Sequence, residues 1–283
     1  MSIVINHLSF AYTQGGKKLE PTLKDLCFTI EEGAFLGIIG HTGSGKSTFV
    51  KHLNGLLPCE KGTVIVDGHD LSEKTERKTV RALVGMVFQY PEYQLFAETV
   101  YEDVSFGPKN MKLDTQEIDK RVKQAMELVG LNPDVFSERS PFDLSGGERR
   151  RTAIAGVLAM QPKYLVLDEP MAGLDPLGRR EILALLEKLR KESGCTIIMI
   201  SHSMDDIANH ATKVLVLEQG SVFLYDTPNL VFSHAEELEK IGLSVPSVTK
   251  ICIEMNRRGA KIPASICTEQ AFLDWFREGN AHA

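Results

Sequence analysis

Cysteine is scarce in this sequence, and its five residues are scattered along the chain. None belongs to a Cys-x-x-Cys pair and their number is odd, which argues against a disulfide framework or a zinc site and favours a reducing cytosol. Long apolar runs are missing as well, because no stretch approaches the roughly 18 residues that cross a bilayer. The first ten residues lack the basic flank and long apolar core of a signal peptide. We therefore expect a chain that does not itself cross a membrane.

A basic excess is also absent. The chain has 32 Lys and Arg against 38 Asp and Glu, a formal net charge of −6. Domains that bind nucleic acid usually carry a basic face, so nucleic acid is not the expected partner. What is present is ordinary for a globular protein: 283 residues, 43% of them hydrophobic, enough for one large domain or two modest ones.

The pattern of apolar runs predicts an α/β fold. Five compact runs are separated by helical stretches, as expected for buried parallel strands: 35–39, 83–88, 164–167, 196–200 and 214–217. Shorter segments rich in β-forming residues, at 3–12, 27–30 and 64–66, predict a small antiparallel layer. The expected core is therefore a mostly parallel, doubly wound sheet with an antiparallel β layer beside it.

Two helical regions interrupt and follow this core. Asp114 with Glu117 has the spacing of a helix start and Gly130 that of a stop, so an inserted helical subdomain is expected at about 94–160. Further on, Thr227-Pro228 and Ser233 with Glu236 predict helix starts. We expect one unit at 1–225 and a C-terminal helical unit at 226–283.

The C-terminal unit carries two apolar stripes at helical spacing. Their members are Val248, Ile251, Cys252 and Met255, then Phe272, Trp275 and Phe276. Such stripes usually belong to a core.

The stretch GHTGSGKST has the spacing of a phosphate-binding loop, Gly-x4-Gly-Lys-Ser, between an apolar strand and a helical pattern. Glycines let successive backbone N–H groups converge on phosphate oxygens, the lysine neutralises the outer phosphates, and Ser47 can hold Mg²⁺. The predicted contacts to a triphosphate are Gly40, His41, Thr42, Gly43, Ser44, Gly45, Lys46, Ser47 and Thr48.

Two carboxylates follow the apolar run at 164–167, where the ligands of open α/β sheets bind. Asp168 is expected to bind Mg²⁺ through water, and Glu169 to act as the general base toward the attacking water. A strand that ends in acidic turn residues is common. The interpretation therefore depends on the phosphate-binding loop in the same chain.

A second Gly-rich helix start, Leu144-Ser145-Gly146-Gly147-Glu148, predicts another anion site. One phosphate loop needs only one such site, so this one is expected to serve another subunit. At this point the sequence resembles the ATP-binding cassette superfamily, a group with a P-loop NTPase core. Its ATPases bind ATP and Mg²⁺ between the phosphate loop of one subunit and the LSGG segment of the other.

The resemblance covers nearly the first 225 residues and implies further site residues. Tyr12 matches the aromatic residue on which adenine stacks, and Gln89 the glutamine that senses the metal and the attacking water. Asp175, in Gly173-Leu174-Asp175, matches the loop that couples the two sites, and His202 matches the switch histidine at the γ-phosphate. By contrast, the run Arg149–Arg151 is expected to be a solvated helix face.

One segment narrows the subclass. Tyr90-Pro91-Glu92-Tyr93-Gln94-Leu95-Phe96 is similar to the energy-coupling factor transporters, which take up vitamins and metal ions such as cobalt and nickel. Other details resemble the second of their two paired ATPase subunits. The resemblance implies a sibling ATPase, with a heterodimer expected and a homodimer possible. It also implies a transmembrane coupling protein docked near Gln89–Val100 and a substrate-binding membrane subunit. For the C-terminal helices it implies dimerisation, as an explanation of the two apolar stripes equal in weight to packing within the chain.

The expected function is therefore an ATPase at the cytoplasmic face of the membrane that powers uptake. The segment at 95–100, with Leu95, Phe96 and Val100 beside polar Glu92 and Gln94, is compatible with a groove that binds a helix. Two alternatives remain: a soluble cassette ATPase that acts on DNA or ribosomes, and the ATPase of an ordinary importer or exporter.

Overall fold

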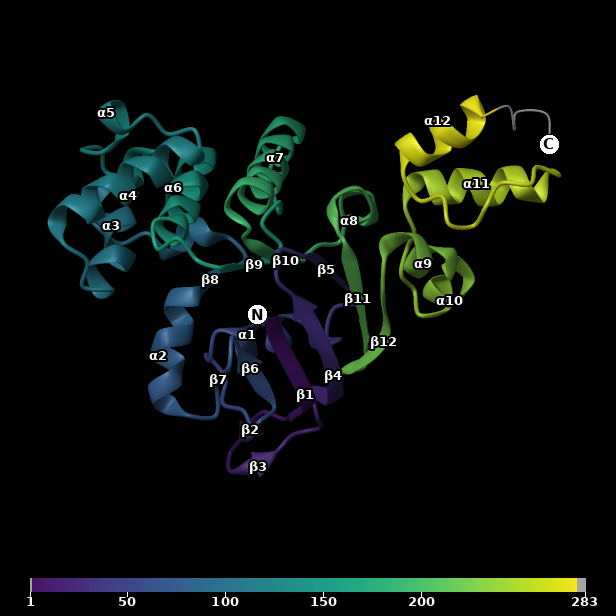
Figure 1. The fold of residues 1–283 in the computed structure, drawn as a ribbon, viewed down its shortest axis with the longest axis horizontal. Helices are drawn as coiled ribbons and strands as arrows, with labels where there is room; N and C mark the ends of the chain where they lie inside the picture. The colour runs from purple at the N-terminus through teal and green to yellow at the C-terminus, as the bar shows by residue number, and fades with distance from the viewer. Residues whose placement is uncertain (1, 279–283) are drawn as a thin grey trace.

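The computed structural model describes residues 2–278, in which two large sheets lie between two groups of helices (Figure 1). The larger sheet has the order β12-β11-β5-β10-β9-β8. Its strands are β5 Phe35–Ile39, β8 Val84–Val87, β9 Tyr164–Asp168, β10 Thr196–Ile200, β11 Lys213–Glu218 and β12 Ser221–Asp226. The neighbours from β8 to β11 pair in parallel, and only β12 is antiparallel. The parallel core expected from the five apolar runs is confirmed.

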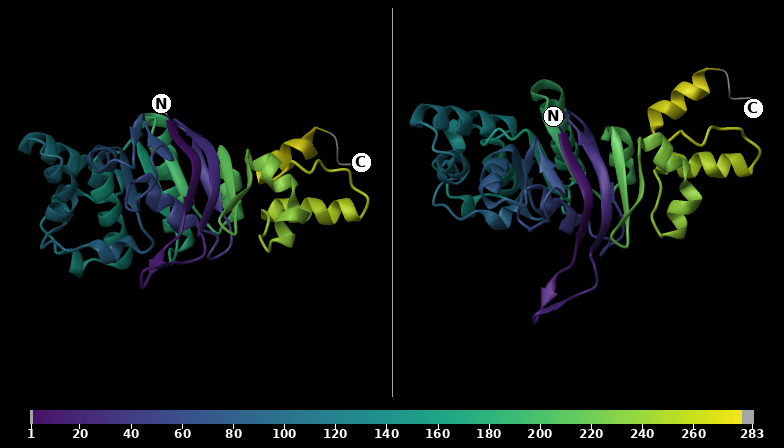
Figure 2. Two further views of the ribbon diagram at one scale, coloured as in Figure 1. Left: turned by 90° about the horizontal axis from the view of Figure 1, so that it is seen from below. Right: turned by 60° about the horizontal axis from the view of Figure 1, so that its bottom comes forward.

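The second sheet is antiparallel, with the order β4-β1-β6-β7. Its strands are β1 Ser2–Phe10, β4 Leu23–Glu31, β6 Val64–Val66 and β7 His69–Asp70. A short hairpin of β2 Thr13–Gln14 and β3 Lys17–Lys18 connects β1 to β4 and projects beyond the ends of these strands (Figure 2). The expected antiparallel layer is therefore present, and the hairpin is an addition that the sequence pattern did not predict.

Alternate residues of β5 face two different cores. Phe35 and Ile39 belong to the cluster that also contains apolar residues of the helices on the outer face of the parallel sheet. Leu36 and Ile38 belong to the cluster between the two sheets, which also includes Phe49. A strand covered on both faces is apolar at every position, which is why these runs do not alternate.

The helices between β5 and β9 are partly those predicted. They are α1 Lys46–Leu53, α2 Lys74–Leu83, α3 Val100–Asn110, α4 Thr115–Leu128, α5 Pro133–Phe136 and α6 Gly146–Leu158, with 3₁₀ turns η1 Pro91–Gln94 and η2 Pro141–Asp143. Helix α1 packs between the sheets, and α3 to α6 gather at one side of the molecule (Figure 1). Asp114 caps α4 as predicted, accepting hydrogen bonds from the N–H groups of Gln116 and Glu117. Helix α2 had not been predicted.

The remaining helices are α7 Pro176–Ser193, α8 Met204–His210, α9 Pro228–Ser233, α10 Ala235–Lys240, α11 Ser247–Arg257 and α12 Glu269–Arg277. The last four lie at the opposite side from α3–α6 (Figure 1). The predicted helix start at Ser233 is wrong, because its hydroxyl donates to the carbonyl of Leu230 in α9 and His234 precedes α10 instead. The expected C-terminal unit, 226–283, extends beyond the described residues at its last five positions.

The two C-terminal stripes are only partly buried. Val248 and Cys252 form a small core with Ile262 and Ile266, against which Phe272 and Trp275 pack. Ile251 and Phe276 are about half exposed. Packing within the chain thus accounts for most of these positions and leaves two apolar side chains at the surface.

Candidate functional site

The predicted site residues collect at the carboxyl ends of adjacent parallel strands. The phosphate loop follows β5, Glu169 follows β9, and His202 lies two residues after β10. Gln89 lies two residues after β8 at the edge of the same sheet. Side chains from four distant parts of the sequence therefore meet because their strands run in parallel and end together.

The phosphate loop has the features of an anion site. Its Gly43 and Gly45 have φ angles of +84° and +99°, which favour glycine. Helix α1 begins at Lys46 without a side-chain cap and without an acidic residue in its first turn, so its N–H groups face the loop unneutralised. The hydroxyl of Ser44 is buried and has no hydrogen-bond partner. These features fit the phosphate groups of a nucleotide.

Lys46 lies across the loop. Its ammonium donates to the carbonyl oxygens of Gly40 at 2.6 Å and His41 at 2.8 Å. Burial lowers the pKa of this lysine, while the charges of Glu169 and Asp168 act in the opposite direction. The ammonium is thus poised where an anion held by the loop would meet it.

Glu169 lies in the loop after β9 and contacts residues in the loops after β8 and β10. Its carboxylate accepts a hydrogen bond from Nε2 of Gln89 at 3.0 Å and lies 2.8 Å from Nε2 of His202. The backbone at Glu169 has a φ of +52°, and its N–H donates to the carbonyl of Ile200. A non-glycine residue in this region is strained, and such strain clusters at functional sites. The arrangement provides a held carboxylate with one amide and one imidazole beside it.

Asp168 lies beside the start of α1. Burial raises the pKa of its carboxyl, the nearby charge of Glu169 adds to this rise, and a hydrogen bond from Ser47 opposes it. A hydroxyl and a carboxylate next to a phosphate loop are oxygen ligands of the kind that Mg²⁺ prefers. The pair fits the metal that accompanies a nucleotide.

Tyr12 lies at the edge of the site, just after β1. Its hydroxyl is 3.2 Å from that of Thr48, and its ring is one third exposed. The ring of Phe10 packs edge-on against Tyr12, and the ring of His52 packs edge-on against Phe10, with centroids 4.9 Å and 4.8 Å apart. An exposed aromatic face supported in this way can stack on a base.

His52 is the unusual member of this aromatic column. It is fully buried, and neither ring nitrogen has a hydrogen-bond partner. Burial lowers its pKa from 6.5 to about 4. The folded protein therefore holds the imidazole neutral at pH values where an unfolded chain protonates it.

We expect this histidine to destabilise the protein in mild acid. Between pH 6.5 and about 4 the unfolded chain binds the extra proton, so the free energy of unfolding falls as the pH falls through this interval. The difference approaches about 3 kcal/mol at the acid end. Denaturant unfolding of the wild type and His52→Leu across this range measures it. The wild-type slope should exceed that of the variant, and equal slopes would contradict the assignment.

Ser145–Gly147 lies apart from this cluster. Ser145 caps α6: its hydroxyl accepts from the N–H of Glu148, whose carboxylate accepts from the N–H of Ser145. No hydrogen bond among residues 2–278 joins Ser145–Gly147 to the phosphate loop. Asp175 is likewise a helix cap, accepting from the N–H of Gly178 at the start of α7. In the single chain these residues have capping roles only.

The arginine run is not the solvated face that was expected. Arg150 is 4% exposed and forms two hydrogen bonds with the carboxylate of Glu92 in η1. Its guanidinium also donates to the carbonyls of Pro170 and Ala172, in the loop after Glu169. The prediction is wrong because a guanidinium supplies five donors, enough to replace water entirely when carbonyls and a carboxylate converge on it. A run of three arginines gives no sequence signal that one of them is buried.

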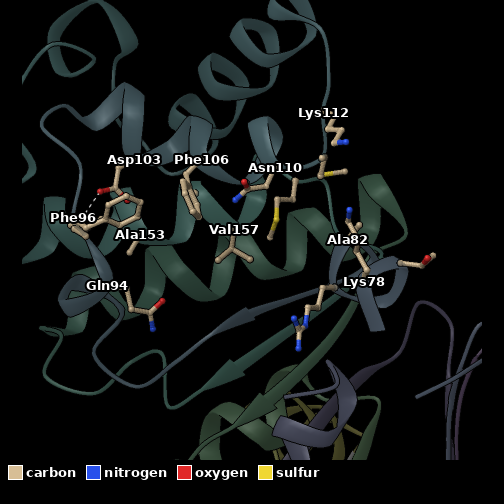
Figure 3. Close-up of a pocket in the computed structure, with 17 residues that line it drawn as sticks. Lys78, Ala82, Gln94, Phe96, Asp103, Phe106, Asn110, Lys112, Ala153 and Val157 are labelled. Carbon is tan, nitrogen blue, oxygen red and sulfur yellow. Dashed lines mark hydrogen bonds between the residues drawn. The ribbon is translucent and has the colours of Figure 1, made fainter. Parts of the chain in front are cut away.

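An apolar groove of about 800 Å³ lies between α2, α3 and α6 (Figure 3). Phe96 and Phe106 pack edge to face at one end and remain 60% and 50% exposed. Val157 and Ala153 of α6 form the floor. Leu95 lines the groove as expected, but Val100 does not, because it is fully buried in the core at the first turn of α3.

Comparisons with known proteins show the family to which the chain belongs. The sequence model of the family "ABC transporter" matches residues 23–172. The chain is 49% identical to the energy-coupling factor transporter ATP-binding protein EcfA2 of Caldanaerobacter subterraneus subsp. tengcongensis, over 95% of this chain and 94% of that one. It is 44% identical to EcfA1 of the same organism, over 95% and 96%.

Two solved structures are similar to most of the fold. The cbiO1 protein of Clostridium perfringens, described as part of the ABC transporter complex cbiONQ, has a TM-score of 0.74 and 37% identity, covering 90% of this chain and 98% of that one. The dimeric ATP-binding cassette MJ0796, in a post-hydrolysis state bound to ADP and Pi, has a TM-score of 0.70 and 28% identity, covering 80% and 98%.

These relatives favour a transporter ATPase over a cassette that acts on DNA or ribosomes. None of the helices within residues 2–278 is long and apolar enough to cross a membrane. The chain is thus an ATP-binding, ATP-hydrolysing protein of the ABC transporter family, and within it belongs to the energy-coupling factor ATP-binding proteins.

Proposed function

We propose that this chain is one of two paired ATPase subunits of an energy-coupling factor transporter. It would lie at the cytoplasmic face of the membrane and drive the uptake of a vitamin or metal ion. The observation that carries the proposal is the carboxylate of Glu169, held between Gln89 and His202 at the sheet edge that also bears the phosphate loop. The similarity to EcfA2 and EcfA1 supports a sibling subunit.

The loop residues 40–48 would hold the triphosphate through their N–H groups, with Lys46 neutralising the outer phosphates and Tyr12 stacking on the adenine. Ser47, Asp168 and Gln89 would hold Mg²⁺, which when bound neutralises phosphate charge. No group of three or more His, Cys, Asp or Glu between residues 2 and 278 is placed to bind a metal. Phosphate oxygens of the bound nucleotide would complete the coordination.

The reaction is an in-line displacement at the γ-phosphorus. The water oxygen bonds to phosphorus, the bond to the β–γ bridging oxygen breaks, and Glu169 takes the proton of the water. Gln89 and His202 orient the water and the γ-phosphate, because both already hold the carboxylate by hydrogen bonds. Products are ADP and phosphate, the pair bound in the MJ0796 cassette.

A second cassette is proposed to complete the site. Ser145, Gly146 and Gly147 would contact the γ-phosphate bound by the partner, and Asp175 would lie between the two sites. No side-chain atom lies within 4 Å of a methyl group built on Gly146 or Gly147, so the surface there is open to a ligand. ATP binds more tightly to the closed dimer than ADP does, and this difference drives closure. Hydrolysis then lets the dimer reopen.

Residues 1–225, with the insertion at about 94–160, are proposed as the ATP-binding unit and 226–283 as a C-terminal unit that supports dimer contact. The groove beside Phe96 and Phe106 would receive a helix of the transmembrane coupling protein, which in turn carries the substrate-binding subunit. An apolar groove between helices fits the apolar face of an amphipathic helix. Motion of the dimer would pass to the membrane through this contact.

Substitution in the groove tests this function. Phe106→Glu should abolish co-purification of the chain with integral membrane proteins from membranes of the source organism, because it places a charge on the apolar surface. ATP hydrolysis by the purified dimer should stay near the wild-type rate. Val135→Glu, at a residue 55% exposed on α5, is the matched control. Equal recovery of membrane partners by both variants would exclude the groove as the docking site.

A further inference from the structure

The segment 242–247, which follows α10 and ends at the first residue of α11, runs from the phosphate loop to α8. We call it the C-terminal linker. Leu243 and Val245 within it are buried in the same core cluster as Met204 and Ile207 of α8. The C-terminal helices are therefore joined to the cassette beside the nucleotide site and are not a detached appendage.

The first end of the linker touches the phosphate loop. A methyl group built on Gly242 would lie 2.6 Å from Nε2 of His41, so the imidazole rests directly on the backbone of Gly242. The φ of Gly242 is +71°, a conformation that favours glycine. The carbonyl of His41 is one of the two acceptors of the Lys46 ammonium. One loop residue thus contacts both the linker and the lysine.

The other end of the linker is bound to α8. The carboxylate of Asp205 accepts hydrogen bonds from the N–H of Ser247 at 2.8 Å and from its hydroxyl at 2.9 Å. Asp205 is in the first turn of α8, whose N-cap is Ser203, the neighbour of His202. A carboxylate at the first N–H of α11 stabilises that helix and fixes the two helix starts to each other.

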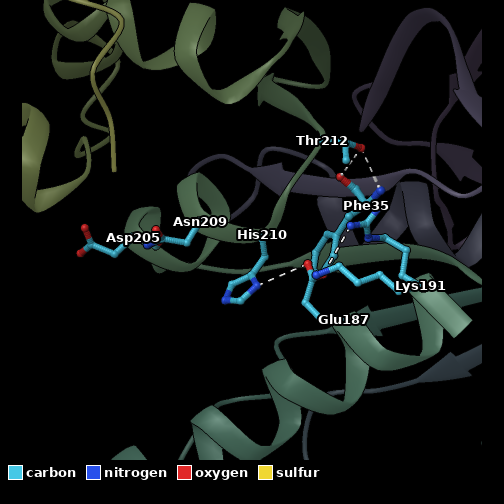
Figure 4. Close-up of polar contacts among 8 residues, drawn as sticks. Phe35, Glu187, Lys191, Asp205, Asn209, His210 and Thr212 are labelled. Carbon is cyan, nitrogen blue, oxygen red and sulfur yellow. Dashed lines mark hydrogen bonds and ion pairs between the residues drawn. The ribbon is translucent and has the colours of Figure 1, made fainter. Parts of the chain in front are cut away.

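Helix α8 is also attached to α7 and to β5. Asp206 pairs with Arg179, one turn after Asp175, at 2.7 Å. At the far end of α8, His210 lies 3.5 Å from Glu187 and stacks on Phe35 (Figure 4). Helix α8 is thus fixed to α7 along its length, while its first turn is fixed to the C-terminal linker.

We propose that His41 and Asp205 are positioning residues, through which the C-terminal linker sets the phosphate loop and the histidine His202 in place. The linker contacts both, so a displacement of the C-terminal helices changes ATP binding through His41 and turnover through Asp205. This inference rests on the proposed function of the nucleotide site. It makes the C-terminal helices a regulatory input to that site.

The test measures the KM for ATP and kcat separately, on the full-length protein in its dimer. Gly242→Ala pushes against His41 and should raise the KM for ATP roughly three- to tenfold while kcat changes less than about twofold. Asp205→Ala frees the first turn of α8 from the C-terminal linker and should lower kcat roughly three- to tenfold with KM within about twofold. Lys250→Ala, exposed on α11 and away from both contacts, is the control.

Two further variants keep the proposal falsifiable if these fold poorly. Ser247→Ala removes only the hydroxyl bond to Asp205 and should give a smaller loss of kcat in the same direction. His41→Ala combined with Gly242→Ala should show a smaller effect of the alanine at 242, since the ring that it strikes is gone. Wild-type KM and kcat in all variants, or a joint decline that follows the melting temperature, would overturn the inference. The proposed function would still be judged independently by Glu169→Gln.

Discussion

Glu169→Gln should bind ATP with an affinity near that of the wild type and lose roughly 10²- to 10⁴-fold in hydrolysis. The introduced amide has the shape of the carboxylate and keeps both neighbours, because its oxygen accepts from Gln89 and its nitrogen can donate to the other tautomer of His202. What it lacks is the capacity to take a proton from water. The loss therefore falls on turnover and spares binding.

Titration with ATP and measurement of phosphate release separate the two effects. Glu192→Gln, an exposed residue in α7, controls for the loss of one negative charge. Hydrolysis near the wild-type rate in Glu169→Gln would remove this residue from the role of general base. Loss of both binding and turnover would instead mean that the carboxylate mainly holds the loops of Gln89 and His202 together.

Ser145→Ala should lower turnover at the nucleotide site of the partner roughly 10²-fold and leave turnover at the site of its own chain unchanged. The physical reason is distance in the fold, since Ser145 shares no hydrogen bond with the phosphate loop of its own chain. Loss of the helix cap should also lower the free energy of unfolding by about 1 kcal/mol. Ser140→Ala, which removes the neighbouring cap of η2, is matched for that effect.

Mixed dimers decide between the two assignments. A chain with Ser145→Ala, paired with a chain in which the catalytic glutamate is replaced by glutamine, should keep one working site if Ser145 acts in the partner. A chain that carries both changes, paired with an unaltered chain, should keep none. The reverse pattern of activity would show that Ser145 serves its own site, and the two-cassette arrangement would fail.

The parts of the fold that could be predicted are those set by local chemistry. The five buried strands were visible because residues such as Phe35 and Leu36 are apolar on both faces, and α4 because Asp114 caps it. Helix α2 was missed because it is mostly polar, with one fully buried residue, Val80. The helix start was predicted at Ser233 by mistake, because a serine hydroxyl can bond to a carbonyl at the end of one helix as well as to an N–H at the start of the next.

For the candidate site, the sequence predicted where the residues lie along the chain but not which of them are in contact. The sequence spacing places Gln89, Glu169 and His202 at strand ends. Gln89 and His202 can both contact the carboxylate of Glu169 only because β9 lies between β8 and β10 in the sheet. The contact of His41 with Gly242 joins positions 201 residues apart and has no local pattern. The same holds for Arg150, whose partners come from two other loops.

The burial of Arg150 limits how the molecule can deform. Its guanidinium joins α6, the turn that contains Glu92 and the loop at 170–172. If α6 rotated away from Glu92 or from the loop at 170–172, the buried guanidinium would lose its hydrogen-bond partners without gaining water. This would cost several kcal/mol. We therefore expect these three segments to move together. If a docked protein tilted the helical insertion, we expect the backbone next to Glu169 to shift with it.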